Sequence, residues 1–384
     1  MQLEWLAFPG WVCLAASVAG LLYLVISAFS VRRILRRTRR SGDSTPITLL
    51  KPLKGADAQL YDNLRSFCAQ DYARFQIIFG VADSDDPAVA AVRRLIAEFP
   101  RRDLTLVTGG PARAPNRKIA NLMNMLPAAR HKLLIITDSD MRVAPDYLSI
   151  VAPLLAAPGA GLVTCLYRGV SAGSDFWSRI ACLHINHGFL PEAAVGEMFN
   201  AGDGAFGATL ALSRDTLDAI GGLEAVADRL ADDHALGAAV RHIGRPVTLA
   251  PVIVDNVIFE PGLAALFRHE LRWARTIRMV APAGYAGSVI THPVALAFLA
   301  ALLHPVPWSF YGLVAAVLVR MGTVWLDDGA LGLPATPFYL IPLRDGLSFA
   351  VFIASFFARR VAWRDRHYRI ARGGRLTLDG DSSV

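Results

Sequence analysis

Two aspartates separated by one serine follow a short apolar run near the middle of the chain. Residues 133–143 read LLIITDSDMRV, so Asp138 and Asp140 come directly after residues typical of a buried strand. On an extended segment, side chains two residues apart point the same way, and two such carboxylates repel each other unless a cation lies beside them. Magnesium and manganese prefer oxygen ligands and commonly bridge carboxylates to a diphosphate. The pattern therefore suggests a metal site, with helix or turn capping by one aspartate as the alternative.

Acidic residues also follow or begin other expected elements. The stretch VADSDDPA places Asp83, Asp85 and Asp86 after the apolar run FQIIFG, where an acid can accept hydrogen bonds from a base or a ribose. For Asp85 and Asp86 the alternative is helix capping before a proline at the first helical position. The stretch LADDHALG sets Asp232 and Asp233 at a helix start, where capping is again the alternative.

Basic and aromatic residues at two further helices complete the set of candidates. The stretch PNRKIANLMN opens a helix with Asn116 and Lys118. A lysine at a helix N-terminus opposes the helix dipole, so it favours a bound anion such as a diphosphate. The stretch RHELRWARTIR places His269, Arg272 and Trp273 on a helix, with His269 and Arg272 on one face. The alternative for this helix is an amphipathic element at a membrane surface.

The elements that must position these residues alternate between strands and helices from residue 46 to about 255. Seven apolar stretches predict strands, namely ITLLKP, FQIIFGVA, LTLVT, LLIITD, GLVTCL, ATLALS and VTLAPV. Strands separated by helices predict an α/β fold with a mostly parallel sheet covered on both faces. Ligands of such sheets bind beyond the carboxyl ends of the strands. Asp138 and Asp140 stand at such an end.

The composition indicates that part of the chain lies in lipid. Of the 384 residues, 54% are hydrophobic and 18% are charged. Residues 5–31 carry no charge and as a helix would reach roughly 40 Å, enough to cross a bilayer. A signal peptide fits poorly, because the start MQLE lacks a basic region and the apolar run is too long. Six arginines between residues 32 and 40 then place everything after the anchor on the cytoplasmic side.

Further apolar segments close the chain. Three stretches between residues 288 and 358 are followed by a basic tail, which favours an even number of crossings and leaves one stretch for the interface. Arg344 and Asp345 lie inside the third stretch, where they pair with each other or form a polar feature facing the catalytic domain. The expected domains are an anchor (1–31), a basic linker (32–45), a cytosolic domain (46–287), membrane or interfacial helices (288–358) and a cytoplasmic tail (359–384).

Charge and cysteine content exclude other classes of protein. The net charge is +7, but the basic residues cluster at membrane edges and no nucleic-acid motif accompanies them. Nucleic acid is therefore excluded as a partner. The four cysteines show no C-x-x-C spacing, so we expect them to be reduced and to pack as small apolar side chains; they are Cys13, Cys68, Cys165 and Cys182.

Five motifs taken in order resemble a known family. The stretches KPLKGAD, DSD, GAFGATLALSRDTLDAIGGL, ADDH and RWARTIR are similar to those of the ceramide glucosyltransferase family, which are membrane-anchored inverting glycosyltransferases with a GT-A fold. The resemblance covers roughly residues 46–285. Within that family, YDNLRSFCAQDY, MLPAARH, GLVTCLYRG and RHELRWARTIR most resemble hopanoid-biosynthesis-associated glycosyltransferases. That resemblance implies transfer of N-acetylglucosamine from its UDP donor to bacteriohopanetetrol, with ceramide and UDP-glucose as the alternative pair.

The resemblance implies roles for the acidic residues. Asp83 or Asp86 matches the acid that contacts the nucleotide. Asp138 and Asp140 match the metal motif for Mg²⁺ or Mn²⁺, and Asp233 matches the catalytic base. A base that removes the proton of an acceptor alcohol during in-line attack inverts the anomeric centre. A retaining hydrolase, which needs a second carboxylate as nucleophile, explains less of the pattern.

The basic and aromatic residues also have counterparts in the family. Arg272 and Trp273 match its closing motif, whereas His269 stands where glutamine or arginine is usual. His187 matches a histidine near the donor or acceptor pocket, with a buried structural histidine as the alternative. Lys118 and Arg272 would neutralise the leaving diphosphate. The resemblance implies a multi-pass protein of the bacterial inner membrane with a cytoplasmic catalytic domain and a lipid alcohol as acceptor.

Two other classes of protein share part of this pattern. A processive polysaccharide synthase shares the fold and the closing Arg-Trp pair, but it normally has glutamine at the place of His269 and more spans. A catalytically inactive membrane scaffold would not need the charged positions that this chain keeps. We therefore expect a lipid glycosyltransferase.

Overall fold

The computed structural model describes residues 4–37, 42, 45–56, 59–200, 205–357, 360–363, 366–370 and 376–378. The chain forms two compact units. A helical unit comprises residues 1–36, 175–201 and 260–362, and a sheet unit comprises residues 37–174, 202–259 and 363–384. Every candidate aspartate, together with Asn116 and Lys118, belongs to the sheet unit, whereas His187 and the closing motif belong to the helical unit.

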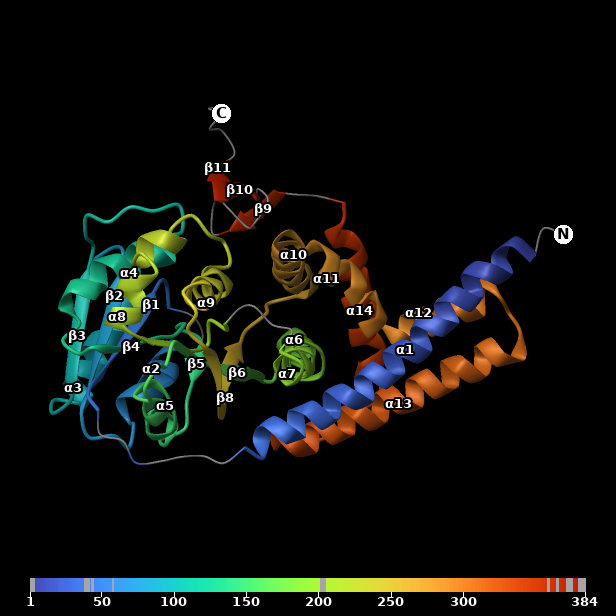
Figure 1. Cartoon of the computed structure of the whole chain (residues 1–384), viewed down its shortest axis with the longest axis horizontal. Coiled ribbons are helices and arrows are strands. Elements are labelled where there is room, and N and C mark those ends of the chain that lie inside the picture. The colour runs from blue at the N-terminus through green and yellow to red at the C-terminus, as the bar shows by residue number, and fades with distance from the viewer. Residues whose placement is uncertain are drawn as a thin grey trace. The chain divides into compact units, whose positions relative to one another are not determined.

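The sheet unit is built on eight hydrogen-bonded strands in the order β3-β2-β1-β4-β7-β6-β8-β5 (Figure 1). Their bounds are β1 Ile47–Leu53, β2 Phe75–Val81, β3 Asp103–Thr108, β4 Leu133–Ile136, β5 Met141–Arg142, β6 Leu162–Ser171, β7 Leu210–Ser213 and β8 Val247–Ile258. The pairs β1–β2, β1–β4, β2–β3 and β6–β8 are parallel, and β4–β7, β6–β7 and β5–β8 are antiparallel. The seven expected strands and the mostly parallel sheet are therefore confirmed. The short strand β5 was not expected.

Helices cover both faces of this sheet. One face packs against α2 (Leu60–Cys68), α3 (Ala88–Glu98) and α5 (Tyr147–Leu155), and the other against α4 (Arg117–Met125), α8 (Arg214–Ala219) and α9 (Asp232–His242). Alternate residues of each strand enter opposite cores, as the two-residue period of a strand requires. Leu49 packs with α2 on the first face, and Leu50 packs with α4 on the second. The short helices η1 (Leu126–Ala128) and η3 (Leu223–Val226) complete the second face.

The helical unit consists largely of long apolar helices. Its elements are α1 Glu4–Leu35, α6 Phe176–His184, the π-helical turn η2 Ile185–Phe189, α7 Leu190–Met198, α10 Leu263–Val280, α11 Pro282–Gly287, η4 Ser288–Thr291, α12 Pro293–Leu303, α13 Pro307–Leu331 and α14 Leu340–Ser355. Figure 1 shows α1 running beside α12 and α13, which it contacts. Three short strands follow, β9 Arg360–Trp363, β10 Arg366–Ile370 and β11 Leu376–Leu378, and form a separate small sheet.

Two described helices are long and apolar enough to cross a membrane, Ala7–Leu35 and Pro307–Leu331. A third crossing is added if the segments Pro282–Thr291 and Pro293–Leu303, bent by 70° at their junction, count as one span. The helix α14 has 16 residues and is shorter than a typical span. The expected N-terminal apolar helix is confirmed, and it continues through Arg32 and Arg33 to Leu35. The number of C-terminal crossings stays a prediction.

Buried ion pairs join the helices of this unit. Arg344 on α14 makes two 2.7 Å hydrogen bonds to the carboxylate of Glu270 on α10, and the two side chains are 2% and 5% exposed. Arg320 on α13 binds Asp345 on α14 at 2.9 Å. Arg344 and Asp345 therefore do not pair with each other, because neighbouring residues on a helix point in different directions and each meets a different helix.

We predict that Arg344 and Glu270 are each costly to replace alone. Removing one partner leaves a buried charge uncompensated, so Arg344→Met or Glu270→Leu should destabilise the protein by about 3–5 kcal/mol. The double variant should recover most of that loss because it removes both charges. Thermal melting in detergent measures the stability of the two single variants and of the double variant. If the losses of the single variants simply add in the double variant, the two charges do not compensate each other in the folded protein.

Candidate active site

The D-x-D stretch forms a turn that begins where β4 ends. The strand β4 stops at Ile136, and the backbone N–H of Met141 donates to the carbonyl of Asp138 at 3.4 Å. The carbonyl of Asp140 accepts from Val257 N at 2.8 Å, which fixes the far side of the turn to β8. The expectation that Asp138 and Asp140 lie on an extended segment is therefore wrong, because the chain turns at Ser139 and Asp140, between the two side chains. Their place at the carboxyl end of β4 is confirmed.

Lys118 lies between two carboxylates from different elements. Its Nζ is 2.8 Å from Asp138 Oδ1 and 3.0 Å from Asp232 Oδ2. Burial disfavours the charged form of Lys118, but Asp138 and Asp232 outweigh burial and raise its pKa. The anion that a lysine at a helix N-terminus favours is thus supplied here by side chains. Lys118 joins the β4 turn, the start of α4 and the start of α9.

Asn116 holds the start of α4 in place. Its Oδ1 accepts hydrogen bonds from Lys118 N at 2.9 Å and Ile119 N at 3.2 Å, and its Nδ2 donates to Arg229 O at 2.9 Å. The residue is fully buried. Asn116 therefore acts as the N-cap of the helix that carries Lys118.

Asp140 carries a buried oxygen without a hydrogen-bond partner. Its Oδ1 is enclosed and unpaired, in contrast to most buried polar atoms. Burial, reinforced by the negative charge of Asp138, raises the pKa of Asp140 to about 6. An enclosed, crowded carboxylate oxygen is what a divalent cation would satisfy.

The space beside Asp138 is kept open by a glycine. A Cβ placed on Gly207 would lie 2.8 Å from Asp138 Oδ2 and 3.4 Å from Asp233 Oδ2. Among the described residues, no group of three or more histidine, cysteine or acidic side chains gathers as a complete ligand set. Asp138 and Asp140 therefore fit a Mg²⁺ or Mn²⁺ ion that takes its remaining ligands from water and a substrate diphosphate.

Asp233 lies in the first turn of α9, close to the charged side chains of Asp232, Lys118 and Asp138. Its Oδ2 accepts from Gly207 N at 3.0 Å and its Oδ1 from His234 N at 2.7 Å. Burial and then the charge of Asp232 raise the pKa of Asp233 to about 6, against the opposing effect of Lys118. A carboxylate that is held in place and has a raised pKa is suited to accept a proton near neutral pH.

The acids after β2 have different environments. Both carboxylate oxygens of Asp86 accept from Gly55 N, at 2.9 and 3.0 Å, and Oδ1 also accepts from Ala88 N at 2.9 Å. The capping alternative for Asp86 is therefore confirmed. Asp83 is exposed and accepts a hydrogen bond from Asp85 N at 3.1 Å. Asp83 is thus the more accessible of the two for a ligand.

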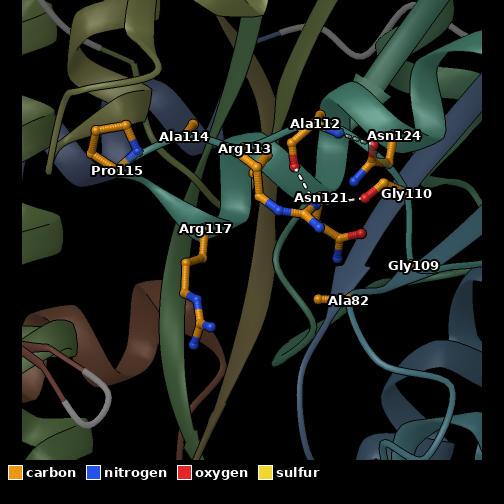
Figure 2. Close-up of a pocket in the computed structure, with 11 residues that line it drawn as sticks. Ala82, Gly109, Gly110, Ala112, Arg113, Ala114, Pro115, Arg117, Asn121 and Asn124 are labelled. Atoms are coloured by element: carbon orange, nitrogen blue, oxygen red, sulfur yellow. Dashed lines mark hydrogen bonds between the residues drawn. The ribbon is translucent and has the colours of Figure 1, made fainter.

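A cleft of about 690 Å³ opens beyond the carboxyl ends of β2 and β3, beside the start of α4 (Figure 2). Its lining includes Ala82, the residue before Asp83, and Asn121, whose Nδ2 donates to Gly80 O at 2.8 Å. In Figure 2 Arg113 turns back toward the carbonyls of its own loop, while Arg117 extends away from that loop. Arg117 offers a positive charge at the helix N-terminus, where anions are favoured.

The closing motif lies on α10 in the helical unit. His269 Nδ1 lies 2.6 Å from Glu260 Oε1, and its ring meets the ring of Trp273 edge-on at 4.5 Å between centroids. Glu260 is 6% exposed in its side chain. His269 therefore links a buried acid to the tryptophan of the motif. Arg272 follows His269 by three residues on the same helix.

His187 lies in the π-helical turn η2 and is buried. Its Nε2 is 3.1 Å from Asp328 Oδ1 and 3.3 Å from Thr336 Oγ1, and its Nδ1 is buried without a partner. Arg320 donates to the carbonyl of His187 at 2.9 Å. π-helical turns occur frequently at functional sites, and the contacts to Asp328 and Thr336 fix this ring.

Sequence analysis did not predict several contacts that hold this site together. Lys51, fully buried in β1, donates to the carbonyl of Asp138, and burial lowers its pKa to about 7 against the charges of Asp140 and Asp138. A lysine inside the apolar run ITLLKPL was a visible signal. Asp232 was placed at a helix start, with capping as the alternative, but its ion pair with Lys118 was not expected. Glu260 gave no signal in the sequence, because its partner His269 is recognisable only in the folded protein.

The comparison with protein families decides the assignment, since the model of glycosyl transferase family 21 matches residues 12–376. The chain belongs to glycosyl transferase family 21. Ceramide glucosyltransferase 1 of Caenorhabditis elegans is 24% identical to it over 395 residues, which cover 96% of this chain and 81% of that protein. Ceramide glucosyltransferase 3 of the same organism is 23% identical over 374 residues, which cover 93% and 79%. The chain is therefore a glycosyltransferase with ceramide glucosyltransferase relatives.

A solved structure shows the same fold. A mannosyltransferase from Pyrobaculum calidifontis, determined with GDP-Man and Mn²⁺, superposes with a TM-score of 0.55 at 19% sequence identity. The match covers 91% of this chain and 99% of the other. The expected GT-A type of sheet is thereby confirmed.

We predict that Gly207→Ala weakens the binding of Mn²⁺. The added Cβ would lie 2.8 Å from Asp138 Oδ2, so the carboxylate must move, and we expect about a tenfold loss of affinity. A Mn²⁺ titration monitored by electron paramagnetic resonance measures the affinity of the variant and of the wild type.

The matched control is Gly196→Ala in α7, where an added Cβ meets nothing within 4 Å. It should leave Mn²⁺ affinity unchanged. Equal affinity in the wild type and Gly207→Ala would show that the open space beside Asp138 is not needed for the cation.

Proposed function

We propose that this glycosyltransferase moves a sugar from a UDP-sugar to the hydroxyl of a membrane lipid, with inversion at the anomeric carbon and with Mg²⁺ or Mn²⁺. The observation that carries the proposal is the group around Lys118, which binds Asp138 and Asp232 at 2.8 and 3.0 Å. Asp140 and Asp233, both with raised pKa, belong to the same group. Membership of family 21 and the names of the relatives support a lipid acceptor.

The donor is assigned to the cleft beyond β2 and β3. Its nucleoside would lie near Ala82, where the exposed Asp83 can accept hydrogen bonds from a base or ribose. We assign this role to Asp83 rather than to Asp86, because Asp86 is already bound by Gly55 N and Ala88 N. The diphosphate would extend toward Asp138 and Asp140.

The reaction needs one base and a neutralised leaving group. Asp233 would take the proton of the acceptor hydroxyl as that oxygen attacks the anomeric carbon, and the bond from that carbon to the diphosphate breaks on the opposite face. A divalent ion bound by Asp138 and Asp140 would supply positive charge to the departing UDP. Lys118 would stabilise the same negative charge. An α-linked donor would therefore give a β-linked glycolipid.

The helical unit is assigned to the acceptor and to the closing motif. By resemblance to the family, Arg272 supplies further positive charge and Trp273 shapes the site, with His269 fixing the tryptophan ring. His187 would contribute to the acceptor or donor pocket. Two membrane-length helices and the run of arginines from Arg32 to Arg40 support a multi-pass protein of the bacterial inner membrane whose catalytic domain faces the cytoplasm.

Two substrate pairs are proposed for this site. The first is UDP-N-acetylglucosamine with bacteriohopanetetrol, on the resemblance of four stretches to the hopanoid-associated enzymes. The second is UDP-glucose with ceramide, which the names of the relatives favour. Crossing both donors with both acceptors, and identifying the glycolipid by mass spectrometry, separates the pairs. A free polysaccharide as product would contradict both and favour a synthase.

We predict that Asp140→Asn and Asp233→Asn each abolish transfer, with losses of about a hundredfold or more. Only Asp140→Asn should weaken Mn²⁺-dependent UDP binding, because Asp233 acts on the acceptor. Transfer assays and calorimetric UDP titrations measure the two effects.

Asp103→Asn is the matched control for both variants. Asp103 begins β3 and pairs on the surface with Arg130 at 2.8 Å, and exposed pairs of this kind contribute little. This variant should bind UDP and transfer sugar as the wild type does. Normal turnover by Asp140→Asn or Asp233→Asn would refute the role given to that residue.

We predict that transfer becomes slower in acid as Asp233 gains a proton. The pKa of its carboxyl is raised to about 6, so the active, ionised form predominates above that pH and the protonated form below it. The value of kcat/KM should fall about tenfold per pH unit below it. A profile of kcat/KM from pH 4.5 to 8 measures this, and a flat profile would exclude Asp233 as the base.

A further inference from the structure

A lysine lies in the core of the sheet unit directly behind the D-x-D turn. Lys51 belongs to β1, between β2 and β4, and its exposure is 0%. Burying an ammonium group is costly unless its charge is compensated, and an apolar side chain is normal at such a position. The presence of Lys51 therefore needs a reason beyond packing.

The ammonium group is directed at the backbone of the turn. Its Nζ donates to the carbonyl of Asp138 at 2.5 Å and lies 3.8 Å from the centroid of the Phe67 ring. Both contacts stabilise a buried cation, the first as a charge-assisted hydrogen bond and the second as a cation–π contact. Lys51 thus binds the first aspartate of the turn through the main-chain carbonyl of Asp138 and not through its carboxylate.

The hydrogen bonds between β1 and β4 end just before this point. Their register stops at Leu50 with Ile136, and Thr137 N donates to Leu50 O at 3.3 Å. Within the turn, the carbonyl of Asp138 also accepts from Met141 N, but at 3.4 Å, which is long for such a bond. Lys51 supplies the much shorter contact at the position where regular pairing has stopped.

Two lysines therefore hold Asp138 from different sides. Lys118 binds its carboxylate at 2.8 Å, and Lys51 binds its carbonyl. The first contact orients the side chain, and the second restrains the backbone from which both Asp138 and Asp140 project.

We infer that Lys51 is a positioning residue that fixes the D-x-D turn so that Asp138 and Asp140 meet the same divalent cation. This inference rests on the cation of the proposed function. The positive charge of Lys51 would by itself repel a cation, so charge and positioning predict opposite effects on metal affinity. The direction of the change on removing Lys51 separates them.

A purely structural role makes a different prediction about stability. Replacing a buried charge with an apolar side chain of similar volume is often neutral or stabilising. If Lys51 serves metal binding, then Lys51→Met should keep or raise the melting temperature while it weakens the site. If Lys51 serves the fold, the melting temperature should fall.

The test uses the full chain in detergent with Lys51→Met. Mn²⁺ affinity is measured in the presence of UDP by electron paramagnetic resonance, and the melting temperature is measured on the metal-free protein. We expect an unchanged or higher melting temperature and a dissociation constant for Mn²⁺ raised about tenfold or more, the range for residues that orient metal ligands.

Thr48→Val is the matched control on the same strand. Thr48 is fully buried and its hydroxyl is hydrogen-bonded to Gln76 Oε1 at 2.9 Å. This variant should melt at a lower temperature and bind Mn²⁺ normally. Lys51→Gln, which keeps an N–H donor without the charge, should lose less Mn²⁺ affinity than Lys51→Met and serves in its place if that variant does not fold.

Three results would overturn parts of the account separately. If Lys51→Met, or Lys51→Gln in its place, binds Mn²⁺ as tightly as the wild type or more tightly, the positioning role is wrong. A lower melting temperature with unchanged affinity would assign Lys51 to the fold alone. Failure of the wild type itself to bind Mn²⁺ would overturn the proposed cation, and the role of Lys51 with it.

Discussion

The crowding of carboxylates at one edge of the sheet is the constraint on which the rest of the structure depends. Asp138, Asp140, Asp232 and Asp233 come from a single turn and one helix start, and Lys118 is the side chain that pairs with two of them. Burial and mutual repulsion raise the pKa of Asp140 and of Asp233. An arrangement of this kind weakens the folded protein, and it is understandable where a bound cation and a reacting hydroxyl offset the cost.

The topology brings these groups together from distant parts of the chain. The turn follows β4, Lys118 begins α4, and the acids Asp232 and Asp233 begin α9. The positive end of the α9 dipole favours both acids, which reduces the cost of their charges. The backbone near Gly207 then passes between Asp138 and Asp233 without a side chain. The proposed metal ligand Asp138 and the proposed base Asp233 are thus separated by a space that a side chain at position 207 would enter.

Local patterns predicted much of this site. Each expected strand formed, and Asp138, Asp140, Asp232 and Asp233 occupy the strand end and helix start that the sequence indicated, because apolar runs and helix starts are local signals. The partners of these residues were not predictable in the same way. Lys51 meets Asp138 across 87 residues of sequence and Arg344 meets Glu270 across 74, so both contacts depend on how strands and helices pack. The extended geometry expected for the D-x-D stretch failed because β4 ends two residues before Asp138.

A cation shared by Asp138 and Asp140 is the central claim, and removal of divalent ions tests it most directly. The purified enzyme would be treated exhaustively with a chelator, and sugar transfer would be measured before and after adding back Mg²⁺ or Mn²⁺. The account predicts that transfer is almost completely lost after chelation and returns with either ion. Transfer at the full rate in the continued presence of chelator would contradict it.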